Sequence, residues 1–427
     1  MSGVLQPLNI FIIGLGGAFL IPLVNRLGRR WLAAAFVLAL AAMTLISGVS
    51  LWRLAEGAAP IDILTGGANP PYAINLRMGL PEAVCAFSVN LVALLGAGSF
   101  VREKYGAMLL CLLLVMGIQG MVMTRDLFNL FVFLEIVSVA TYGLLSLEDR
   151  PAALSASFKY LMATVMASTF FLMGTILLYA ATGMLNVDDL IAARATISGP
   201  IGFAALMFLL ASLLLELKPF PANGWGLDVY ETARSDVAAL ISGGVSAGVF
   251  FALLKLLPLF DGQLGLISAL CAVTFLFSNL IGLCQTRAQR LLGYSSISQM
   301  SLLTLAACLL VQLQSGSSTL YLVVGALFVN HLFAKVGLFW LAGHVGGKRL
   351  VDWSTFSGRP GAIFLFCLLL AAISGFPPFP GFWAKWRLVL SLAADERYVW
   401  IAIVLTGSLL EAAYLFRWFG HVVHSPV

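Results

Sequence analysis

The feature that most constrains this chain is a series of thirteen apolar runs, most of them close to twenty residues long. A helix of about 20 apolar residues is what a hydrocarbon core of about 30 Å requires. Of the 427 residues, 61% are hydrophobic and 10% are charged, whereas a soluble domain carries about 25% charged residues. We therefore expect an all-α polytopic membrane protein with about thirteen transmembrane helices. They are predicted at residues 8–25, 31–53, 78–101, 105–124, 127–147, 153–182, 200–217, 236–258, 264–284, 293–312, 317–345, 362–389 and 398–419.

Two of the apolar runs are interrupted by prolines, and the two interruptions lie five runs apart. The first covers residues 216–221, and the second covers residues 374–385 and ends at Lys385. Proline removes a backbone donor and clashes with the preceding turn, so neither helix continues regularly through its break. In lipid, a broken helix is tolerated only where protein or a water-filled cavity surrounds it. Paired breaks in two halves of a chain point to the ion pathway of an inverted-repeat transporter.

Ionisable side chains inside the apolar runs are the main candidates for function, because each is expensive at bilayer depth. His331 and Lys335 are four residues apart, so they share one face of a helix. Imidazole suits a proton relay because it titrates near neutral pH. Some of the charged groups can instead be structural ion pairs or lysines that reach the membrane interface. The candidates are Glu135, Lys159, Glu216, Lys218, Lys255, His331, Lys335, Lys385 and Glu411, and the structural alternative applies most to Lys159, Lys255 and Glu411.

The cysteines and the basic residues limit the classes of function. The six cysteines are scattered singly, without a CxxC or a cysteine–histidine cluster, so neither an iron–sulfur site nor zinc is indicated. The net charge of +5 comes from basic residues that lie mostly in short loops. We expect no cofactor, no metal and no nucleic-acid partner. Residues 8–24 are expected to be a retained first helix, because they lack the basic flank and cleavage site of a signal peptide.

The distribution of basic residues predicts the orientation in the membrane. If the N-terminus is outside, thirteen lysines and arginines fall in inner loops and five in outer loops. This distribution follows the positive-inside rule. We therefore expect a multi-pass protein of the cell inner (cytoplasmic) membrane, with its N-terminus outside and its C-terminus in the cytoplasm.

Six motifs along residues 105–390 resemble the antiporter-like membrane subunits of respiratory complex I, membrane-bound hydrogenases, sulfane reductase and Mrp cation/proton antiporters. Residues 125–135 resemble the fifth helix of that family with its glutamate, and residues 290–300 resemble the entry to the tenth. Residues 331–339 resemble the family's His-x3-Lys helix. The other three are Lys159-Tyr160, the turn at residues 224–230 and the broken twelfth helix at residues 375–385.

The resemblance implies a single membrane domain over residues 1–427, built from two inverted five-helix repeats in which helices 7 and 12 are broken. Helices 1–3 would occupy residues 1–104. Helices 4–8 would form the first repeat at residues 105–260, and helices 9–13 the second at residues 261–420.

The resemblance also implies a row of ion-relaying residues. Glu135 would modulate a lysine on helix 7, His331 and Lys335 would relay, and Lys385 would be the exit-side group. A lysine on helix 12 resembles the N-type subunit of complex I. The predicted proton pathway is Glu135, Glu216, Lys218, Lys255, His331, Lys335 and Lys385.

The first half of the chain departs from the family pattern at two positions. Glu216 stands where the family has its helix 7 lysine, and Lys218 is the nearest lysine. Ala247 replaces the relay lysine of helix 8, and Lys255 lies two turns further along. The sequence leaves open whether Glu216 or Lys218 faces the pathway, and whether the first half conducts.

The function implied by the resemblance is that of a proton- or sodium-translocating membrane subunit of a complex I-like redox-driven pump, of the NADH:quinone oxidoreductase or membrane-bound hydrogenase type. Such a subunit is not itself the catalyst, because electrons would travel in peripheral redox subunits. Its partners would be those subunits, other membrane subunits and the lipid bilayer. Two alternatives stay open, a subunit of an Mrp-type multisubunit cation/proton antiporter and a non-pumping membrane scaffold.

Overall fold

The computed structural model describes residues 5–68, 70–148, 150–197, 199–345 and 348–423. These residues are almost entirely helical, which confirms the predicted all-α class. Within these ranges the only strands are β1 (Ile61–Leu64) and β2 (Asn75–Met78), which pair antiparallel.

Eleven helical segments within the described residues are long and apolar enough, by length and composition, to cross a membrane. The chain is therefore a multi-pass membrane protein. The count of thirteen spans stays a prediction, because the predicted runs at 236–258 and 264–284 form one continuous segment, Ser235–Gly282, and the run at 362–389 is not among the eleven. The run at 236–258 contains α10 (Ser235–Leu240), a π-helical turn (Ile241–Val245) and α11 (Ser246–Leu256). The run at 362–389 is divided into α15 (Pro360–Ser374) and α16 (Pro380–Ala394).

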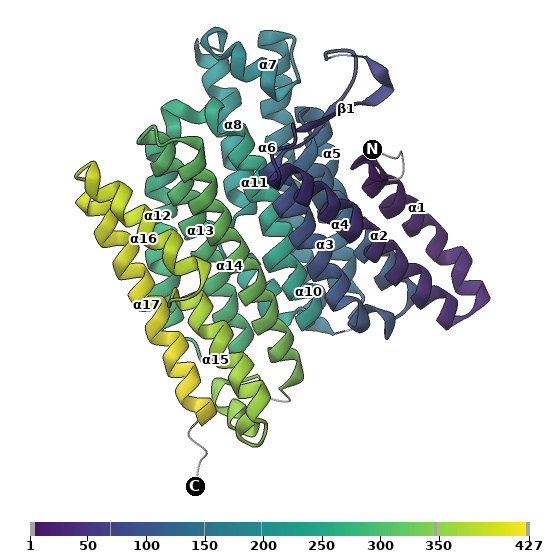
Figure 1. Cartoon of the computed structure of the whole chain (residues 1–427), viewed down its shortest axis with the longest axis vertical. Helices are drawn as coiled ribbons and strands as arrows, with labels where there is room; N and C mark the ends of the chain where they lie inside the picture. The colour runs from purple at the N-terminus through teal and green to yellow at the C-terminus, as the bar shows by residue number, and fades with distance from the viewer. Residues whose placement is uncertain (1–4, 69, 149, 198, 346–347, 424–427) are drawn as a thin grey trace. The chain divides into compact units, whose positions relative to one another are not determined.

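The chain divides into two compact units, and the first comprises Met1–Glu216 and Gly244–Asp261. Its helices pack mostly against their neighbours in sequence, and α6 and α8 run side by side in Figure 1. Its helices are α1 (Leu8–Val24), α2 (Arg29–Ala55), α3 (Leu80–Val101), α4 (Tyr105–Met123), α5 (Leu127–Ser146), α6 (Pro151–Thr182), the short α7 (Val187–Ala192), α8 (Gly199–Glu216) and α11.

The β1–β2 hairpin, which the apolar runs do not predict, lies against the connection between α4 and α5. The backbone N–H of Arg125 donates to the carbonyl of Asn75 at 2.8 Å, and Leu76 forms a β-bridge with Thr124. On its other side the carbonyl of Arg125 accepts from the N–H of Val187 at 2.8 Å. The connection is therefore held by backbone bonds on both sides of Arg125.

The second unit comprises Leu217–Gly243 and Gly262–Val427. Its central helix α13 packs between α12 and α14 (Figure 1) and is buried along nearly its whole length. Polar side chains on α13 therefore face protein rather than lipid. The helices of this unit are α9 (Gly224–Thr232), α10, α12 (Leu264–Gly282), α13 (Ala288–Gln312), α14 (Ser317–His344), α15, α16 and α17 (Tyr398–Val423).

Both predicted helix breaks are present, and their exposed backbone groups have protein partners. At the first break the N–H of Phe220 donates to Thr274 Oγ1 at 3.0 Å. At the second break Asn330 Nδ2 donates to the carbonyl of Ala372 at 2.9 Å, within the last turn of α15. The last carbonyls of a helix have no partner inside the helix, and in lipid each would cost several kcal/mol if left unpaired. Each break therefore has one backbone group that bonds a side chain of another helix, Thr274 at the first and Asn330 at the second.

Candidate functional site

Lys335 lies in a buried polar cluster formed by α13, α14 and α17. Its Nζ donates to Ser295 Oγ, and Ser295 Oγ donates in turn to Glu411 Oε1 at 2.5 Å. Lys335 and Glu411 are both 0% exposed. A serine hydroxyl both accepts and donates, so it can link a donor-only ammonium to an acceptor-only carboxylate. The three side chains form a continuous hydrogen-bonded path between opposite charges.

The carboxylate of Glu411 has two further polar neighbours. Gln299 Nε2 donates to Oε2, and Tyr414 Oη lies 3.5 Å from Oε1. The same Tyr414 hydroxyl donates to Asn279 Oδ1 at 3.0 Å. Burying an ionised carboxylate is expensive unless it is paired and hydrogen-bonded. Glu411 meets both conditions, which explains how the structure tolerates it at full burial.

Glu411 is the functional candidate that the predicted pathway omits. As a single carboxylate in the last apolar run, it is expected from the sequence to belong to a structural ion pair. The signal that points to it is on α13, where Ser295 and Gln299 are four residues apart and share one helix face. Two polar side chains on a buried face need polar partners. The sequence does not identify Glu411 as that partner, since 116 residues separate it from Ser295.

His331 lies one turn from Lys335 on α14 and contacts the π-helical turn. Its Nε2 is 3.4 Å from the carbonyl oxygen of Ser242, and Ser242 Oγ is 2.7 Å from Ser296 Oγ. His331 Nδ1 is buried and has no hydrogen-bond partner among the described residues. Ser295 of α13 therefore contacts Lys335 directly, whereas the adjacent Ser296 bonds the hydroxyl of Ser242, whose backbone carbonyl faces His331. Turns of π-helix are frequent at functional sites.

Lys385, the predicted exit-side group, extends from α16 toward the second helix break. A Cβ at Gly375 would lie 3.2 Å from Lys385 Nζ, so glycine leaves room for the ammonium there. That Nζ is buried and has no hydrogen-bond partner within the described part of the chain. Lys335 interacts electrostatically with both Glu411 and Lys385. The structure thus brings two predicted lysines around one unpredicted carboxylate.

Lys218 lies at the first break, 2% exposed and with a positive φ of 61°. A non-glycine residue in the left-handed region costs about 1–3 kcal/mol, and such strain clusters at functional sites. Its Nζ is 5.2 Å from the ring centroid of Trp225 and 5.9 Å from that of Tyr230. A Cβ at Gly226 would lie 2.4 Å from Lys218 Cδ, so only glycine fits beneath the side chain. Lys218 is held by the faces of two aromatic rings.

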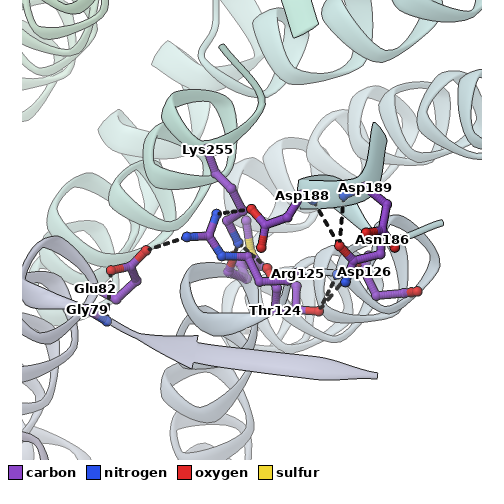
Figure 2. A network of polar contacts seen from close by, with 10 residues as sticks. Gly79, Glu82, Thr124, Arg125, Asp126, Asn186, Asp188, Asp189 and Lys255 are labelled. Atoms are coloured by element: carbon purple, nitrogen blue, oxygen red, sulfur yellow. Dashed lines mark hydrogen bonds and ion pairs between the residues drawn. The ribbon is translucent and has the colours of Figure 1, made fainter. Parts of the chain in front are cut away.

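The predicted pathway residues of the first unit, all within the described ranges, do not form a cluster like the one around Lys335. Glu135 is half-buried on α5, and Glu216 is the last residue of α8 and 5% exposed. Ala247, at the family's relay-lysine position, is buried on α11. Lys255 Nζ donates to the carbonyl oxygens of Met121 at 2.8 Å and Thr124 at 2.5 Å, where α4 ends (Figure 2).

An ion-pair network surrounds the α4–α5 connection next to Lys255. Figure 2 shows the Arg125 guanidinium between Glu82 and Asp188, at 3.5 Å and 3.7 Å. Asp126 caps α5 by accepting from the N–H of Asn129 at 2.8 Å. Burial raises the pKa of the Asp126 carboxyl, although its bonds from backbone N–H groups oppose that rise. Every contact here joins or caps chain segments, which is the pattern of a structural clamp.

The chain is similar to known proteins over most of its length. Residues 124–411 match the family described as NADH:quinone oxidoreductase/Mrp antiporter, transmembrane. NADH-quinone oxidoreductase subunit N of Desulforudis audaxviator (strain MP104C) is 32% identical over 437 residues, covering 96% of this chain and 85% of that protein. The D-type subunit of a Na(+)/H(+) antiporter from Alkalihalophilus pseudofirmus is 27% identical, and the match covers 89% of this chain and 78% of that protein. Against several other curated relatives the chain spans 59% to 65% of their length.

A solved structure supports the same grouping. A chain of the membrane-bound sulfane sulfur reductase, described as an archaeal respiratory membrane complex, superposes with a TM-score of 0.89 at 29% identity. The match covers 97% of this chain and 87% of that one. The family match takes in well over half of the residues and includes Glu135, Lys335 and Glu411. As its motifs predict, the chain belongs to the NADH:quinone oxidoreductase/Mrp antiporter transmembrane family.

Proposed function

We propose that this chain is the ion-translocating membrane subunit, carrying protons or sodium ions, of a complex I-like redox-driven complex. The observation that carries the proposal is the buried path from Lys335 through Ser295 to Glu411. In a low-dielectric interior, opposite charges interact far more strongly than in water. A charge that arrives at one end of this path therefore changes the energy of the charge at the other end, which is what coupled ion transfer requires.

The proposed pathway keeps six of the seven predicted residues and adds one. Its members are Glu135, Glu216, Lys218, His331, Lys335 and Lys385, with Glu411 as the counter-ion of Lys335. We propose a structural role for Lys255, because its ammonium donates to backbone carbonyls, which have no proton to pass on. We further propose that residues 105–260 and 261–420 are the two inverted repeats, preceded by helices within residues 1–104.

The energy for translocation would come from partner subunits. Moving one charge against the membrane potential requires about 2.3 kcal/mol per 100 mV. The relatives include a quinone oxidoreductase subunit and a chain of a sulfane sulfur reductase. We infer that this chain assembles with other membrane subunits and with peripheral redox subunits in the inner membrane. Its N-terminus would be outside and its C-terminus cytoplasmic, in keeping with the basic loops.

A second candidate is a subunit of an Mrp-type antiporter, which the similarity to the D-type subunit of a Na(+)/H(+) antiporter favours. Isolation from native membranes in mild detergent, followed by mass spectrometry, separates the two. Iron–sulfur, nickel–iron or quinone-site partners support the redox-driven complex. Co-purification of small hydrophobic antiporter subunits alone supports the antiporter.

The test of ion translocation is Lys335→Ala in inverted membrane vesicles that hold the native complex. We expect most of the ion uptake to be lost while the complex still assembles, because the ammonium end of the buried path is gone. Lys104→Ala is the matched control, since this exposed lysine lies in a loop and outside the proposed pathway. Uptake at the wild-type rate in assembled Lys335→Ala complexes would refute the relay.

A further inference from the structure

A cavity of about 430 Å³ at one end of the second unit is not used by the proposed ion pathway. Among the described residues, three arginines and a histidine line it, and this lining includes no aspartate or glutamate. Its volume is within the range of about 300–1,000 Å³ that is usual for small-molecule sites. The lining residues are Gln285, Thr286, Arg287, Arg349, Leu350, Val351, Arg417 and His421. This group is called the arginine pocket below.

Two loops form the floor of the arginine pocket, and backbone hydrogen bonds hold them together. The N–H of Ala288 donates to the carbonyl of Lys348 at 3.0 Å, and that of Leu350 donates to the carbonyl of Thr286 at 2.8 Å. Arg287 and Arg349 are thereby directly opposite each other in an antiparallel β-bridge. Like charges directly opposite in such a pair are destabilising. An anion between the two guanidinium groups would offset that repulsion.

The third arginine is positioned by neutral acceptors. The guanidinium of Arg417, on α17, donates to the backbone carbonyls of Leu283 and Gln285. These bonds fix the orientation of the guanidinium, but a carbonyl carries no net charge and leaves the cation uncompensated. His421 is one turn further along the same helix face. Arg417 is therefore oriented in advance toward the same pocket.

Of the three pocket arginines, Arg287 has a carboxylate partner. It forms an ion pair with Glu231, which also pairs with Arg290 at 2.6 Å. Burial alone would raise the pKa of Glu231, but these two guanidinium groups lower it below its ordinary value. Asp352 is close in sequence but accepts from the backbone N–H of Arg349 at 2.8 Å. Among the described residues, the guanidinium groups of Arg349 and Arg417 form no ion pair.

We propose that the arginine pocket binds a phosphate-group anion, supplied either by the headgroup of an anionic phospholipid or by free phosphate. Planar guanidinium groups match phosphate oxygens in a bidentate way, which explains arginine rather than lysine at the three positions. In the orientation proposed above, the pocket at the C-terminal end of α17 is on the cytoplasmic side, where basic pockets between transmembrane helices suit lipid headgroups. Val351, an exposed apolar side chain of the pocket lining, offers surface for an acyl chain.

Lipid retention by the purified full-length chain tests the proposal. Detergent micelles would be doped with phosphatidylglycerol or with phosphatidylcholine, and bound lipid would be counted by native mass spectrometry. We expect the wild type to retain phosphatidylglycerol selectively and the variant R349Q/R417Q to bind it at least about tenfold more weakly, since each 1.4 kcal/mol is a factor of ten. The variant R26Q/R30Q is the matched control, because it removes two exposed arginines far along the sequence from the pocket.

A parallel measurement with inorganic phosphate separates the two sources of the anion. Stabilisation of the wild type, but not of R349Q/R417Q, against thermal unfolding by phosphate, without selective lipid retention, would support the pocket and assign it to a soluble anion. If loss of Arg417 unfolds the chain, the single variant Arg349→Gln is measured in place of R349Q/R417Q. The proposal is overturned if the pocket variants match the wild type with both probes, or if R26Q/R30Q loses the lipid equally.

Discussion

Two buried lysines of the predicted pathway, Lys255 in the first unit and Lys335 in the second, have different hydrogen-bond acceptors in the structure. Lys255 donates to two backbone carbonyls at the end of α4. Lys335 donates to a side-chain hydroxyl that itself donates to a carboxylate. A carbonyl oxygen accepts a hydrogen bond but has no proton to pass on, whereas a hydroxyl can do both.

Burial of a lysine therefore does not by itself indicate ion transfer. A cation that ends on the carbonyls of a helix C-terminus is stabilised by the helix dipole and holds that terminus in place. An ammonium that donates to a hydroxyl, as Lys335 does, can pass a proton on, because the hydroxyl can release its own proton to the next acceptor. We therefore expect variants of the two clusters to separate stability from translocation.

The largest effect is expected for Glu411→Gln, because this change leaves Lys335 buried without its counter-ion. Removing one partner of a directly contacting buried ion pair costs about 3–5 kcal/mol, which is an upper bound here because Ser295 lies between the two charges. We expect a large drop in the thermal unfolding temperature of the purified chain and ion uptake near background in vesicles. The double variant Lys335→Met/Glu411→Gln should regain stability but no uptake. A double variant as unstable as the single one would contradict the pairing.

A smaller effect is expected for Ser295→Ala, which removes the hydroxyl between the two charges and keeps both. Alanine can neither accept nor donate a proton, so uptake should fall about tenfold or more. Stability should fall by about 1.5–3 kcal/mol, because a hydrogen bond to a charged group is lost. Ser301→Ala is the control, since that serine also lies on α13 but donates only to Ile297 of its own helix, at 2.9 Å. Equal uptake by the two variants would show that the hydroxyl path is not used.

For Lys255→Met we expect a loss of stability of about 1–3 kcal/mol, because two carbonyls at the end of α4 lose their buried donor. Thermal unfolding of the purified chain measures this. Uptake per assembled complex should stay near that of the wild type. A stable variant with reduced uptake would instead return Lys255 to the ion pathway.

The smallest effect concerns acid stability and Glu231. Because its pKa is lowered in the folded chain, Glu231 contributes stability above its ordinary pKa, and that contribution is lost as the pH falls through the lowered value. Glu231→Gln should therefore be less stable than the wild type at neutral pH and converge with it in acid. Thermal unfolding between about pH 7 and pH 3 checks this. A constant gap between the two curves would mean that the charge of Glu231 is not the cause.

The sequence predicts the helices and their breaks, because local hydrophobicity and local prolines determine them. Bilayer thickness sets helix length, so the apolar runs locate the helices, and prolines locate the breaks at Lys218 and Lys385. The β1–β2 hairpin escapes prediction because its bonds reach Thr124 and Arg125, far along the chain. Short strands without a clear period are not separable from loops in a sequence.

The polar partners of the buried charges are harder to predict, because they come from distant helices. Lys255 finds its acceptors 131 and 134 residues away, and Ser295 finds Glu411 at a separation of 116. The sequence shows that such groups must be satisfied, but not by which atoms. Whether a buried lysine is structural or relays protons depends on the hydrogen-bond acceptor that it finds. That acceptor is known only from the packed structure.

Ion uptake by vesicles that hold the assembled complex, with Lys335→Met and Lys255→Met compared in the same assay, tests the central claim most directly. The account predicts uptake near background for Lys335→Met and near the wild-type rate for Lys255→Met, each normalised to assembled complex. Equal losses in the two variants, or a larger loss in Lys255→Met, would contradict it.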